Sequence, residues 1–549
     1  MKKLIFIFTL LTAILLPTGC FNDLGNYDYT ELDEITITGL PDELELLGFV
    51  DNITLIPTIT SLKEGIIGNN HPNYTVLYEM RRTDANTMPS RNVFDTLNTT
   101  GNFSIDILAA YPPGRYQCWM RVIDKRTGIS TSHFTIIVVG STTNMGWMVL
   151  CNEGPQERVR LDFISRISSE RIETIYDVAQ GLPTLHHATQ LGFQPMAQSP
   201  GNQIIIFSKE GSYHLNFNTL ASDELSEFNL NNFIFSPGEL MTHFSSFAIR
   251  GDNAYNHRYS VSFSVGGNVY CRDNTATASS FGSAINTTEP GTPPEFRVAP
   301  YFGFSEVRDG TTGPNGTSAM LYDIDNKRFV AFRGAVTGPN VVSGANSQRL
   351  SPLVDGPDDL FSWQTGKELV YMEGTRYGQG NVYAILENSA GERSLCGVDM
   401  SGTGFFQNYY QEVVTAPDFK QAEHFAFHSQ FPLMYYATSS KVYVYNLATQ
   451  VTTDITSTVV NSGEEVTRIR FNLHRHPRLV GTGNGPITDQ SPENINRQFH
   501  LVACTFNSAA GINGGRVGIY QVPLYGAPLT RTEQYTGFAK IKDIVYKVR

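Results

Sequence analysis

Cys20 is the residue whose chemistry the surrounding sequence specifies most closely. Two lysines follow the initial methionine, an apolar run continues almost unbroken to Leu16, and Pro17–Gly19 precede the cysteine. Lysines, a short apolar segment and small residues are typical of a secretory signal peptide. A bacterial lipoprotein is cleaved just before such a cysteine and acylated on its sulfur. We therefore expect residues 1–19 to be a signal peptide and Cys20 to carry lipid; the alternative is an ordinary secreted protein with a cysteine near its cleavage point.

The apolar run also limits how the chain can be attached to a membrane. It falls short of the roughly 20 residues that a membrane-spanning helix needs, and no later apolar stretch is long enough. Acyl chains such as palmitate on Cys20 are then the expected anchor, because several acyl chains together hold a protein durably.

Close pairs of histidines are the first candidates for metal ligands. Residues two or four apart on a strand share a face, so two imidazoles could reach one ion. A metal site needs further ligands and none is evident, so we expect hydrogen-bonded or exposed histidines and no metal. The pairs are His186 with His187, His424 with His428, and His474 with His476.

The segment Asp323-Ile324-Asp325-Asn326 resembles the start of a calcium loop, with oxygen-bearing side chains at alternate positions. It lacks the glycine and the distant glutamate that complete an EF-hand. Asp and Asn favour tight turns without any ion, so we interpret the segment as a hairpin turn.

Motifs for catalysis are missing from the sequence. There is no His-Glu-x-x-His, no Gly-x-Ser-x-Gly and no phosphate-binding glycine loop. A glycosidase needs two carboxylates across a cleft, but the sequence cannot select a pair among 52 acidic residues. We name no catalytic residue, and expect no cofactor and no enzymatic activity.

Aromatic side chains could bind carbohydrate if they were exposed. Trp363 lies in a long loop-like stretch, whereas Phe405-Phe406 and Tyr409-Tyr410 are better interpreted as packing within a sheet. The cysteines beyond Cys20 are far apart and odd in number, and we expect buried free thiols rather than disulfides. These are Cys118, Cys151, Cys271, Cys396 and Cys504.

The composition predicts an all-β protein. Tyr (26) and Phe (34) are plentiful, Gly (48) and Pro (27) recur throughout, and no helical period is sustained. A formal charge of −12 without any basic cluster argues against a nucleic-acid partner.

The N-terminal part has the length of an immunoglobulin-like sandwich. A polar tether spans residues 20–32, and alternating strands then run through residues 33–140. The clearest hairpin places the alternating residues 116–122 and 134–139 on either side of a turn at Asp124–Gly128.

The remainder, residues 141–549, is a repeat of apolar hairpins about 60 residues apart. Such sheets must stack on neighbours, and a ring gives each sheet two partners, so we predict a β-propeller of about seven blades. The alternating run at Ile544, Tyr546 and Val548 should pair within the blade that closes the ring. A row of immunoglobulin-like modules is the alternative. The hairpins centre near Gly154, Gly211, Gly266, Asp325, Gly391, Ser439 and Gly514.

Two long stretches between hairpins are rich in Thr, Ser, Gly, Pro and Asn. They span residues 274–318, which include Phe302 and Phe304, and residues 334–363. Long loops in compact domains are commonly functional or mobile, and we expect both to project from one face of the ring.

Two segments resemble the PKD-like family of Bacteroidetes lipoproteins. Residues Cys20–Tyr29 leading into Glu34–Ile37 are similar to the start of those proteins. The series Pro113–Tyr116, Val122–Asp124 and Thr127-Gly128 is similar to the late strands of PKD repeats, although the Trp-x-Phe-Gly-Asp-Gly motif of ordinary PKD domains is missing.

The resemblance implies an outer-membrane lipoprotein, exposed at the cell surface and accessory to a TonB-dependent importer of the SusC/SusD type. Such a protein would bind or present nutrient, either oligopeptide or glycan, without catalysis. Two alternatives stay open: a polysaccharide hydrolase or lyase that uses the propeller, and an adhesin or envelope scaffold.

Overall fold

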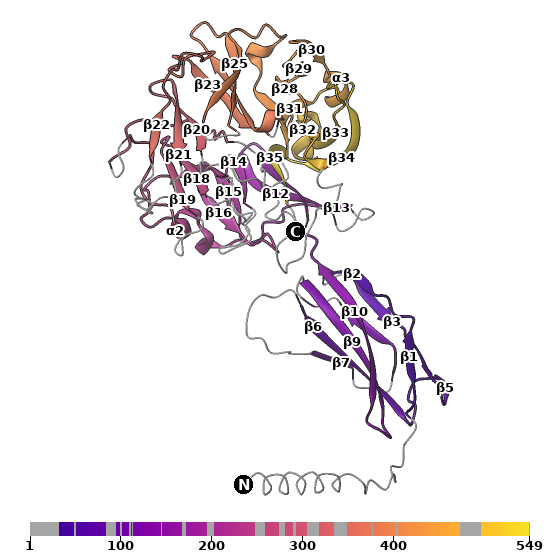
Figure 1. Cartoon of the computed structure of the whole chain (residues 1–549). Helices are drawn as coiled ribbons and strands as arrows, with labels where there is room; N and C mark the ends of the chain where they lie inside the picture. Colours follow the sequence, from indigo (N-terminus) through magenta and orange to yellow (C-terminus); the bar gives the residue numbers. More distant parts are fainter. Residues whose placement is uncertain are drawn as a thin grey trace, which may run out of the picture. The chain divides into compact units, whose positions relative to one another are not determined.

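The computed structural model describes most of the chain beyond the N-terminal segment (Figure 1). The described residues are 32–48, 51–83, 95–98, 102–108, 111, 114–143, 145–166, 172–194, 203–247, 259–273, 280–288, 292–304, 318–333, 349–375, 377–400, 404–472 and 496–547. The expected signal peptide, Cys20 and all but one residue of the expected tether lie outside them. Among the described residues, no helix has the length and apolar character needed to cross a bilayer.

The chain forms two compact units, residues Met1–Gly140 and Ser141–Arg549. Both are built from strands, as the composition predicts. The helices of the described residues are short: η1 (Glu224–Ser226), α2 (Phe228–Asn232), η2 (Tyr377–Gln379), η3 (Phe419–Gln421), α3 (Thr456–Val459) and η4 (Ser508–Asn513).

The first unit is an immunoglobulin-like sandwich. Its strands, in spatial order, are β1 (Ile35–Thr38), β4 (Thr58–Ser61) and β5 (Gly65–Ile67); β2 (Glu43–Leu47), β10 (Ser130–Gly140), β9 (Gly114–Asp124), β6 (Tyr74–Arg82) and β7 (Asp95–Asn98); and β3 (Asn52–Leu55) with β8 (Ile105–Leu108). Strand β9 alternates strictly between buried and half-buried residues, because one of its faces lies on the core.

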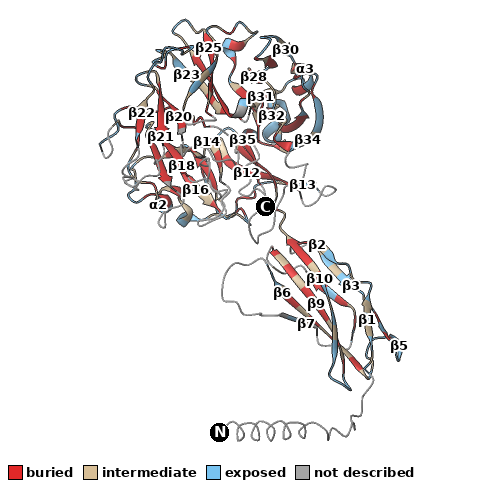
Figure 2. Cartoon of the chain, in the orientation of Figure 1, coloured by how far each residue is buried: buried red, intermediate tan, exposed pale blue. Residues whose placement is uncertain are grey.

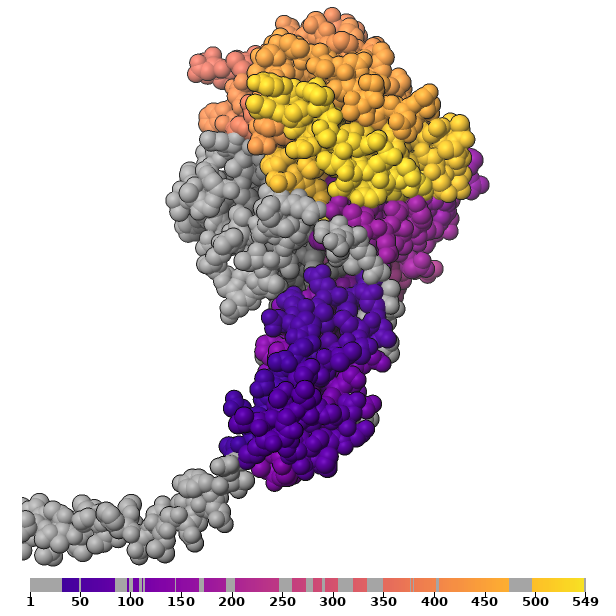
Figure 3. All heavy atoms as spheres, turned by 90° about the vertical axis from the view of Figure 1, so that its right-hand side faces the viewer, coloured from indigo at the N-terminus to yellow at the C-terminus, as the bar shows by residue number. Residues whose placement is uncertain are grey.

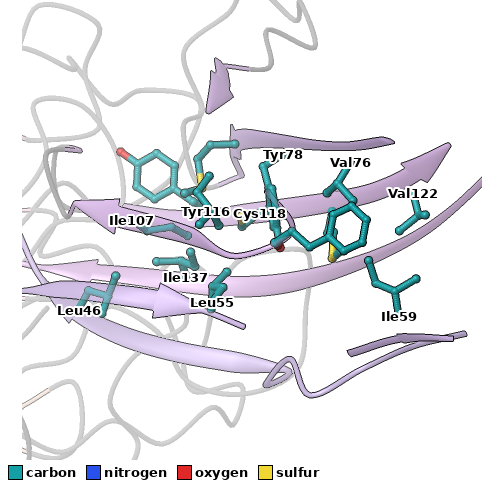
Figure 4. Close-up of a cluster of buried hydrophobic side chains, with 14 of the residues drawn as sticks. Leu46, Leu55, Ile59, Val76, Tyr78, Ile107, Tyr116, Cys118, Val122 and Ile137 are labelled. Atoms are coloured by element: carbon teal, nitrogen blue, oxygen red, sulfur yellow. The ribbon is translucent and has the colours of Figure 1, made fainter. Parts of the chain in front are cut away.

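The core of the sandwich lies between its sheets (Figure 4). Val76, Tyr78, Cys118 and Val122 contribute from β6 and β9, and Ile59 contributes from β4. The hydroxyl of Tyr78 donates a hydrogen bond of 2.7 Å to the carbonyl of Phe103. The one polar atom of this buried ring is therefore satisfied.

The described residues of the second unit form seven sheets of three or four strands. Their strands, in spatial order, are β14 (Ala188–Gln194), β15 (Gln203–Ser208) and β16 (Ser212–Leu215); β17 (Met241–Phe247), β18 (Tyr259–Ser264) and β19 (Val269–Asp273); β20 (Ser318–Asp323), β21 (Arg328–Arg333) and β22 (Leu350–Pro352); β23 (Glu368–Gly374), β24 (Asn381–Glu387), β25 (Arg393–Asp399) and β26 (Phe406–Gln411); β27 (His424–Phe427), β28 (Leu433–Ala437), β29 (Val442–Asn446) and β30 (Thr452–Asp454); β31 (Glu465–Phe471), β32 (His500–Phe506), β33 (Gly515–Gln521) and β34 (Thr530–Phe538); and β35 (Lys540–Lys547), β11 (Gly146–Glu153), β12 (Arg158–Arg166) and β13 (Ile172–Ile175).

The last strand closes the ring. Strand β35 pairs antiparallel with β11, from Gly146 opposite Lys547 to Asn152 opposite Lys540, so one blade combines both ends of the unit. The space-filling view shows the C-terminal residues against the beginning of this unit (Figure 3). The predicted seven-bladed propeller is confirmed, and a row of immunoglobulin-like modules is wrong.

Each of the seven predicted hairpins joins two neighbouring strands of one blade. Gly154 lies between β11 and β12, for example, and Ser439 lies between β28 and β29. These middle strands are almost wholly buried, because neighbouring blades cover both of their faces (Figure 2).

The two long stretches between hairpins do not simply project from the ring. In the described part of the first, Phe302 and Phe304 are buried, and Gly303 exchanges backbone hydrogen bonds with Met320 of β20. In the described part of the second, Phe361 and Trp363 pack on Phe329 of β21. The expectation of projecting loops is wrong for these residues, because their aromatic side chains complete the core of a blade.

Candidate functional site in the centre of the propeller

The innermost strands of the blades surround a cavity of about 390 Å³. Strands β14, β17, β23, β27, β31 and β35 each line it, and the segment Pro300–Phe304 takes the same place in the blade of β20–β22. All seven blades therefore contribute to one site. Its polar and charged lining residues are Thr189, Gln190, His243, Ser245, Tyr301, Tyr371, Glu373, Glu423, His424, Arg468, Arg470, Asn472, Lys542, Asp543 and Tyr546.

A recurrent β-bulge directs part of this lining. In five of the inner strands, one residue has no partner in the register with the neighbouring strand. These strands are β14, β17, β23, β31 and β35. A bulge bends its strand and re-aims the side chains beside it. The residues directly after the skipped positions all line the cavity: Gln190, His243, Tyr371, Arg468 and Asp543.

Asp543 is the most completely bonded group of the site. Its Oδ1 accepts hydrogen bonds from Arg470 Nη1 at 2.8 Å and from its neighbour's amide, Ile544 N, at 3.0 Å. Its Oδ2 accepts from Leu191 N at 3.1 Å. Burial would raise the pKa of this carboxyl, but Arg470 and Arg468 outweigh it and hold the pKa below its usual range. Asp543 is therefore a fixed anion.

Arg468 lies beside this pair without completing it. Its Nε is 3.7 Å from Asp543 Oδ1, beyond hydrogen-bond distance, and no described residue accepts a hydrogen bond from this buried atom. Lys542, the bulge residue of β35, is a further cation beside Arg468 and Arg470. Burial lowers the pKa of its ammonium group.

Glu373 on β23 behaves differently from Asp543. Its Oε2 accepts a hydrogen bond of 3.0 Å from Phe427 N. Burial is the dominant effect and raises the pKa of its carboxyl to about 7, against the opposing influence of that amide, Arg470 and Arg468. The site thus holds one carboxyl that exchanges protons near neutral pH and one that stays ionised.

The histidines of the cavity are neutral near pH 7. Burial lowers the pKa of His243 and of His424 to about 4, and Arg468 disfavours the charged form of both. His243 Nδ1 lies 3.0 Å from the hydroxyl of Thr242. These imidazoles therefore supply hydrogen-bonding nitrogen atoms rather than charge.

Aromatic rings form one wall of the cavity. The rings of Tyr301 and Tyr371 meet edge to face with centroids 5.4 Å apart. Tyr371 packs in turn on Phe425 at 5.5 Å and on Phe427 at 6.5 Å. These contacts hold the wall in place and leave both phenols half-buried.

The candidate metal ligands from the sequence separate in the structure. His424 lines the cavity, whereas His428 is buried among Phe431, Phe471 and Phe499. His428 Nδ1 accepts hydrogen bonds from Gln430 N and Phe431 N, so it has no lone pair for an ion.

The other histidine pairs behave as polar contacts or lie outside the described residues. His186 pairs with Glu210 at 3.0 Å and His187 with Glu157 at 2.7 Å. His474 and His476 lie outside the described residues. In the described part of the chain, no three His, Cys, Asp or Glu side chains gather closely enough to hold a metal ion.

The segment from Asp323 to Asn326 is the hairpin turn between β20 and β21, as predicted. Asp323 Oδ1 accepts from the backbone N–H of Asp325 and of Asn326, and Oδ2 accepts from Arg328 Nε at 2.8 Å. Asp325 pairs with Arg297. The carboxylates are therefore occupied by the turn and its neighbours.

The prediction of buried thiols is confirmed: among the described residues, no disulfide involves Cys118, Cys151, Cys271, Cys396 or Cys504, and all five are buried. The proposal of Trp363 as an exposed aromatic is wrong, because this ring is only 3% exposed. Phe406 is 60% exposed, in contrast to the expectation that it packs within a sheet, while Tyr409 and Tyr410 are half-buried as expected.

Sequence reasoning missed the charged residues of the cavity. Arg468 and Arg470 lie two apart in the run Val466–Phe471, and Lys542-Asp543 interrupts the apolar alternation of the last strand. Charges on a strand that is otherwise buried are the signal that could have found them.

The PKD-like family matches residues 20–184, under a third of the chain. No curated protein matches this chain significantly.

Among solved structures, a quinonprotein alcohol dehydrogenase-like protein from Bacteroides thetaiotaomicron is similar at 10% identity, with a TM-score of 0.39 and coverage of 94% of this chain and 100% of that one. Sqt1 from Chaetomium thermophilum bound to the N-terminus of ribosomal protein L10 is 12% identical, with a TM-score of 0.35 and coverage of 71% and 83%. The WD40 domain of SCAP from fission yeast is 6% identical, with a TM-score of 0.32 and coverage of 61% and 63%.

Proposed function

We propose that this protein is a non-catalytic outer-membrane lipoprotein that binds an oligopeptide or a glycan in its propeller cavity. It presents this nutrient at the cell surface to a TonB-dependent importer of the SusC/SusD type. The observation that carries the proposal is the cavity itself. Its volume of about 390 Å³ lies within the usual range of ligand sites, and its polar groups converge from seven blades.

The anchoring part of the proposal rests on the N-terminal sequence. Lipid on Cys20 would tie the chain to the membrane and leave the propeller in water. Replacing Cys20 with Ser should move the protein from the membrane fraction to the soluble fraction and abolish labelling by radioactive palmitate. A Cys20→Ser variant that stays membrane-bound and labelled would contradict this part.

Binding is tested with the full-length protein purified in detergent. Isothermal titration calorimetry against panels of oligopeptides and oligosaccharides should find at least one ligand with a micromolar Kd. Ser245→Trp, which fills part of the cavity, should weaken binding at least tenfold. Ser440→Trp in the exposed turn between β28 and β29 is the matched control and should bind as the wild type does.

Partnership is tested separately by purification from solubilised outer membranes. The protein should bring down a TonB-dependent barrel and its lid-like partner. If the protein binds ligand but no barrel co-purifies, the binding role stands and the partnership with an importer is contradicted. If wild type and Ser245→Trp bind equally well, the cavity is not the binding site.

A second candidate function is hydrolysis of a glycosidic bond. Glu373, with a pKa of about 7, and Asp543, with a lowered pKa, line one cavity. Two carboxyls whose pKa values are pushed apart are the combination that glycosidases use as acid and base. Turnover of any glycan that is abolished by Glu373→Gln would replace the non-catalytic proposal.

A further inference from the structure

Arg468 is a cation that the protein only partly compensates. It lies on the inner strand β31, and its side chain is 36% exposed to the cavity. Its Nε is buried, and among the described residues no oxygen accepts a hydrogen bond from this atom; Asp543 Oδ1 lies 3.7 Å away. Leaving a charged donor unbonded costs free energy, so such a group is a candidate for binding an external acceptor.

Asp543 does not neutralise Arg468 in the way that it neutralises Arg470. Both of its oxygens already accept hydrogen bonds, from Arg470 and from two backbone amides. Its charge therefore serves to hold Arg470 against β35. The cavity retains Arg468 and Lys542 beyond this pair.

The remaining carboxyls add little compensation. Glu373 accepts a hydrogen bond from Phe427 N, and its pKa near 7 leaves it partly protonated at neutral pH. Glu423 is exposed to water, where its charge is screened. The inner part of the cavity is thus electropositive, although it is lined by as many acidic as basic residues.

The aromatic wall lies next to Arg468. Burial raises the pKa of Tyr301 and of Tyr371, and the nearby Arg468 opposes the rise for both phenols. A ligand bound at the guanidinium therefore lies near two aromatic rings. The neutral imidazoles of His243 and His424 also line the cavity, whereas both ends of the Gln190 amide are bonded to the backbone of Phe244.

We propose that the cavity binds an acidic oligosaccharide. The carboxylate of a uronic acid unit accepts hydrogen bonds from Arg468, and its sugar ring lies against Tyr301 and Tyr371. A guanidinium matches a carboxylate with two parallel hydrogen bonds. The aromatic faces and neutral polar groups favour a polyhydroxylated ring over an acidic peptide. This inference rests on the proposed function and narrows its ligand class.

The test compares ligands that differ in charge and in backbone. Full-length protein in detergent is titrated with trigalacturonate, trimannuronate, neutral galactotriose and triglutamate. At least one uronate trimer should bind at least tenfold more tightly than galactotriose and triglutamate. Its affinity should fall as salt is raised, because the contact is ionic.

Variants assign the contact to Arg468. Arg468→Gln should lower uronate affinity at least tenfold and leave the Arg470–Asp543 pair in place. Arg468→Lys keeps the charge but not the paired donors and should bind at least threefold more weakly than wild type, which keeps the test informative if the glutamine variant does not fold. Arg531→Gln, an exposed arginine on β34 of the same blade, is the control and should not change binding.

The outcomes separate this inference from the proposed function. Tight binding of galactotriose alone overturns the acidic ligand but keeps glycan binding, and preference for triglutamate assigns a peptide instead. Uronate binding that is unchanged in both Arg468 variants also overturns the inference. If none of these probes and no member of the wider panels binds, the proposed function fails as well.

Discussion

Glu373 and Asp543 show how two carboxyls in one cavity acquire opposite properties. Asp543 accepts three hydrogen bonds, one of them from Arg470, whereas Glu373 accepts one from Phe427 N and interacts with the hydroxyl of Tyr371, which carries no charge. The unfavourable solvation of a buried charge dominates where few donors compensate for it. The pKa of Glu373 consequently rises to about 7, while the pKa of Asp543 falls below its usual range.

Replacing Glu373 with Gln should change how stability depends on pH. The native pKa of about 7 exceeds the unfolded value of 4.5, so the native state keeps a proton that the unfolded state releases, and wild-type stability falls as pH rises through this window. As pH rises from 5 to 8, the free energy of unfolding of the glutamine variant should increase by about 1 to 3 kcal/mol relative to that of wild type. Urea unfolding at four pH values measures this difference. Glu423→Gln is the exposed control, and parallel curves for wild type and Glu373→Gln would contradict the argument.

The closing strand β35 is the element on which the ring depends. It supplies the innermost strand of the blade that contains β11, and Ile541, Ile544 and Tyr546 are buried in a core that this blade shares with the β31–β34 blade. The rings of Tyr546 and of Trp147 on β11 meet edge to face with centroids 5.0 Å apart. Residues separated by almost the whole unit therefore share one core.

Truncating a side chain of β35 should destabilise the propeller strongly. Ile544→Ala removes a fully buried side chain and should lower the free energy of unfolding by about 2 to 5 kcal/mol. Val451→Ala, at a position that is 59% exposed, should change it by less than about 0.5 kcal/mol. Urea unfolding followed by tryptophan fluorescence compares the two variants. Equal effects would show that β35 does not close the cooperative core.

Across the propeller, buried histidines set the response to acid. Burial lowers the pKa of four imidazoles to about 4, compared with 6.5 when exposed: His214, His243, His424 and His428. The unfolded chain binds protons that the native chain excludes, so the stability contributed above pH 6.5 is lost as pH falls towards 4. Glu373 has the opposite effect, since its raised pKa favours the native state at low pH, but one group changes the stability less than four histidines do.

Acidification should therefore lower the melting temperature well before most carboxylates titrate. Thermal melts between pH 7.5 and pH 4.5 should show a continuous fall in Tm. The double variant His243→Asn, His424→Gln should show a shallower fall, because two of the four groups no longer take up protons on unfolding. Val451→Ala, at a position that is 59% exposed and carries no titrating group, is the control and should follow the wild-type slope. A wild-type Tm that is constant over this range would refute the assignment.

Much of the fold follows from local sequence. Alternating apolar residues around turn residues such as Asp323–Asn326 and Ser439-Ser440 specify hairpins without reference to the rest of the chain, and all seven predicted hairpins are present. The ring could be inferred because stacked sheets need partners on both faces. The packing of Phe302, Phe304 and Trp363 could not be, because their stretches lack the alternation that marks a strand.

The sequence by itself determined the all-β class, the hairpins and the closing role of the last apolar run, since each depends on neighbours along the chain. Only the tertiary structure decided which side chains form the cavity. Leu191 and Asp543 meet there across most of the propeller sequence, and β-bulges turn Arg468 and Tyr371 towards the same space. A site assembled from a few residues in each of seven blades leaves no contiguous motif, because every blade supplies only a fragment of it.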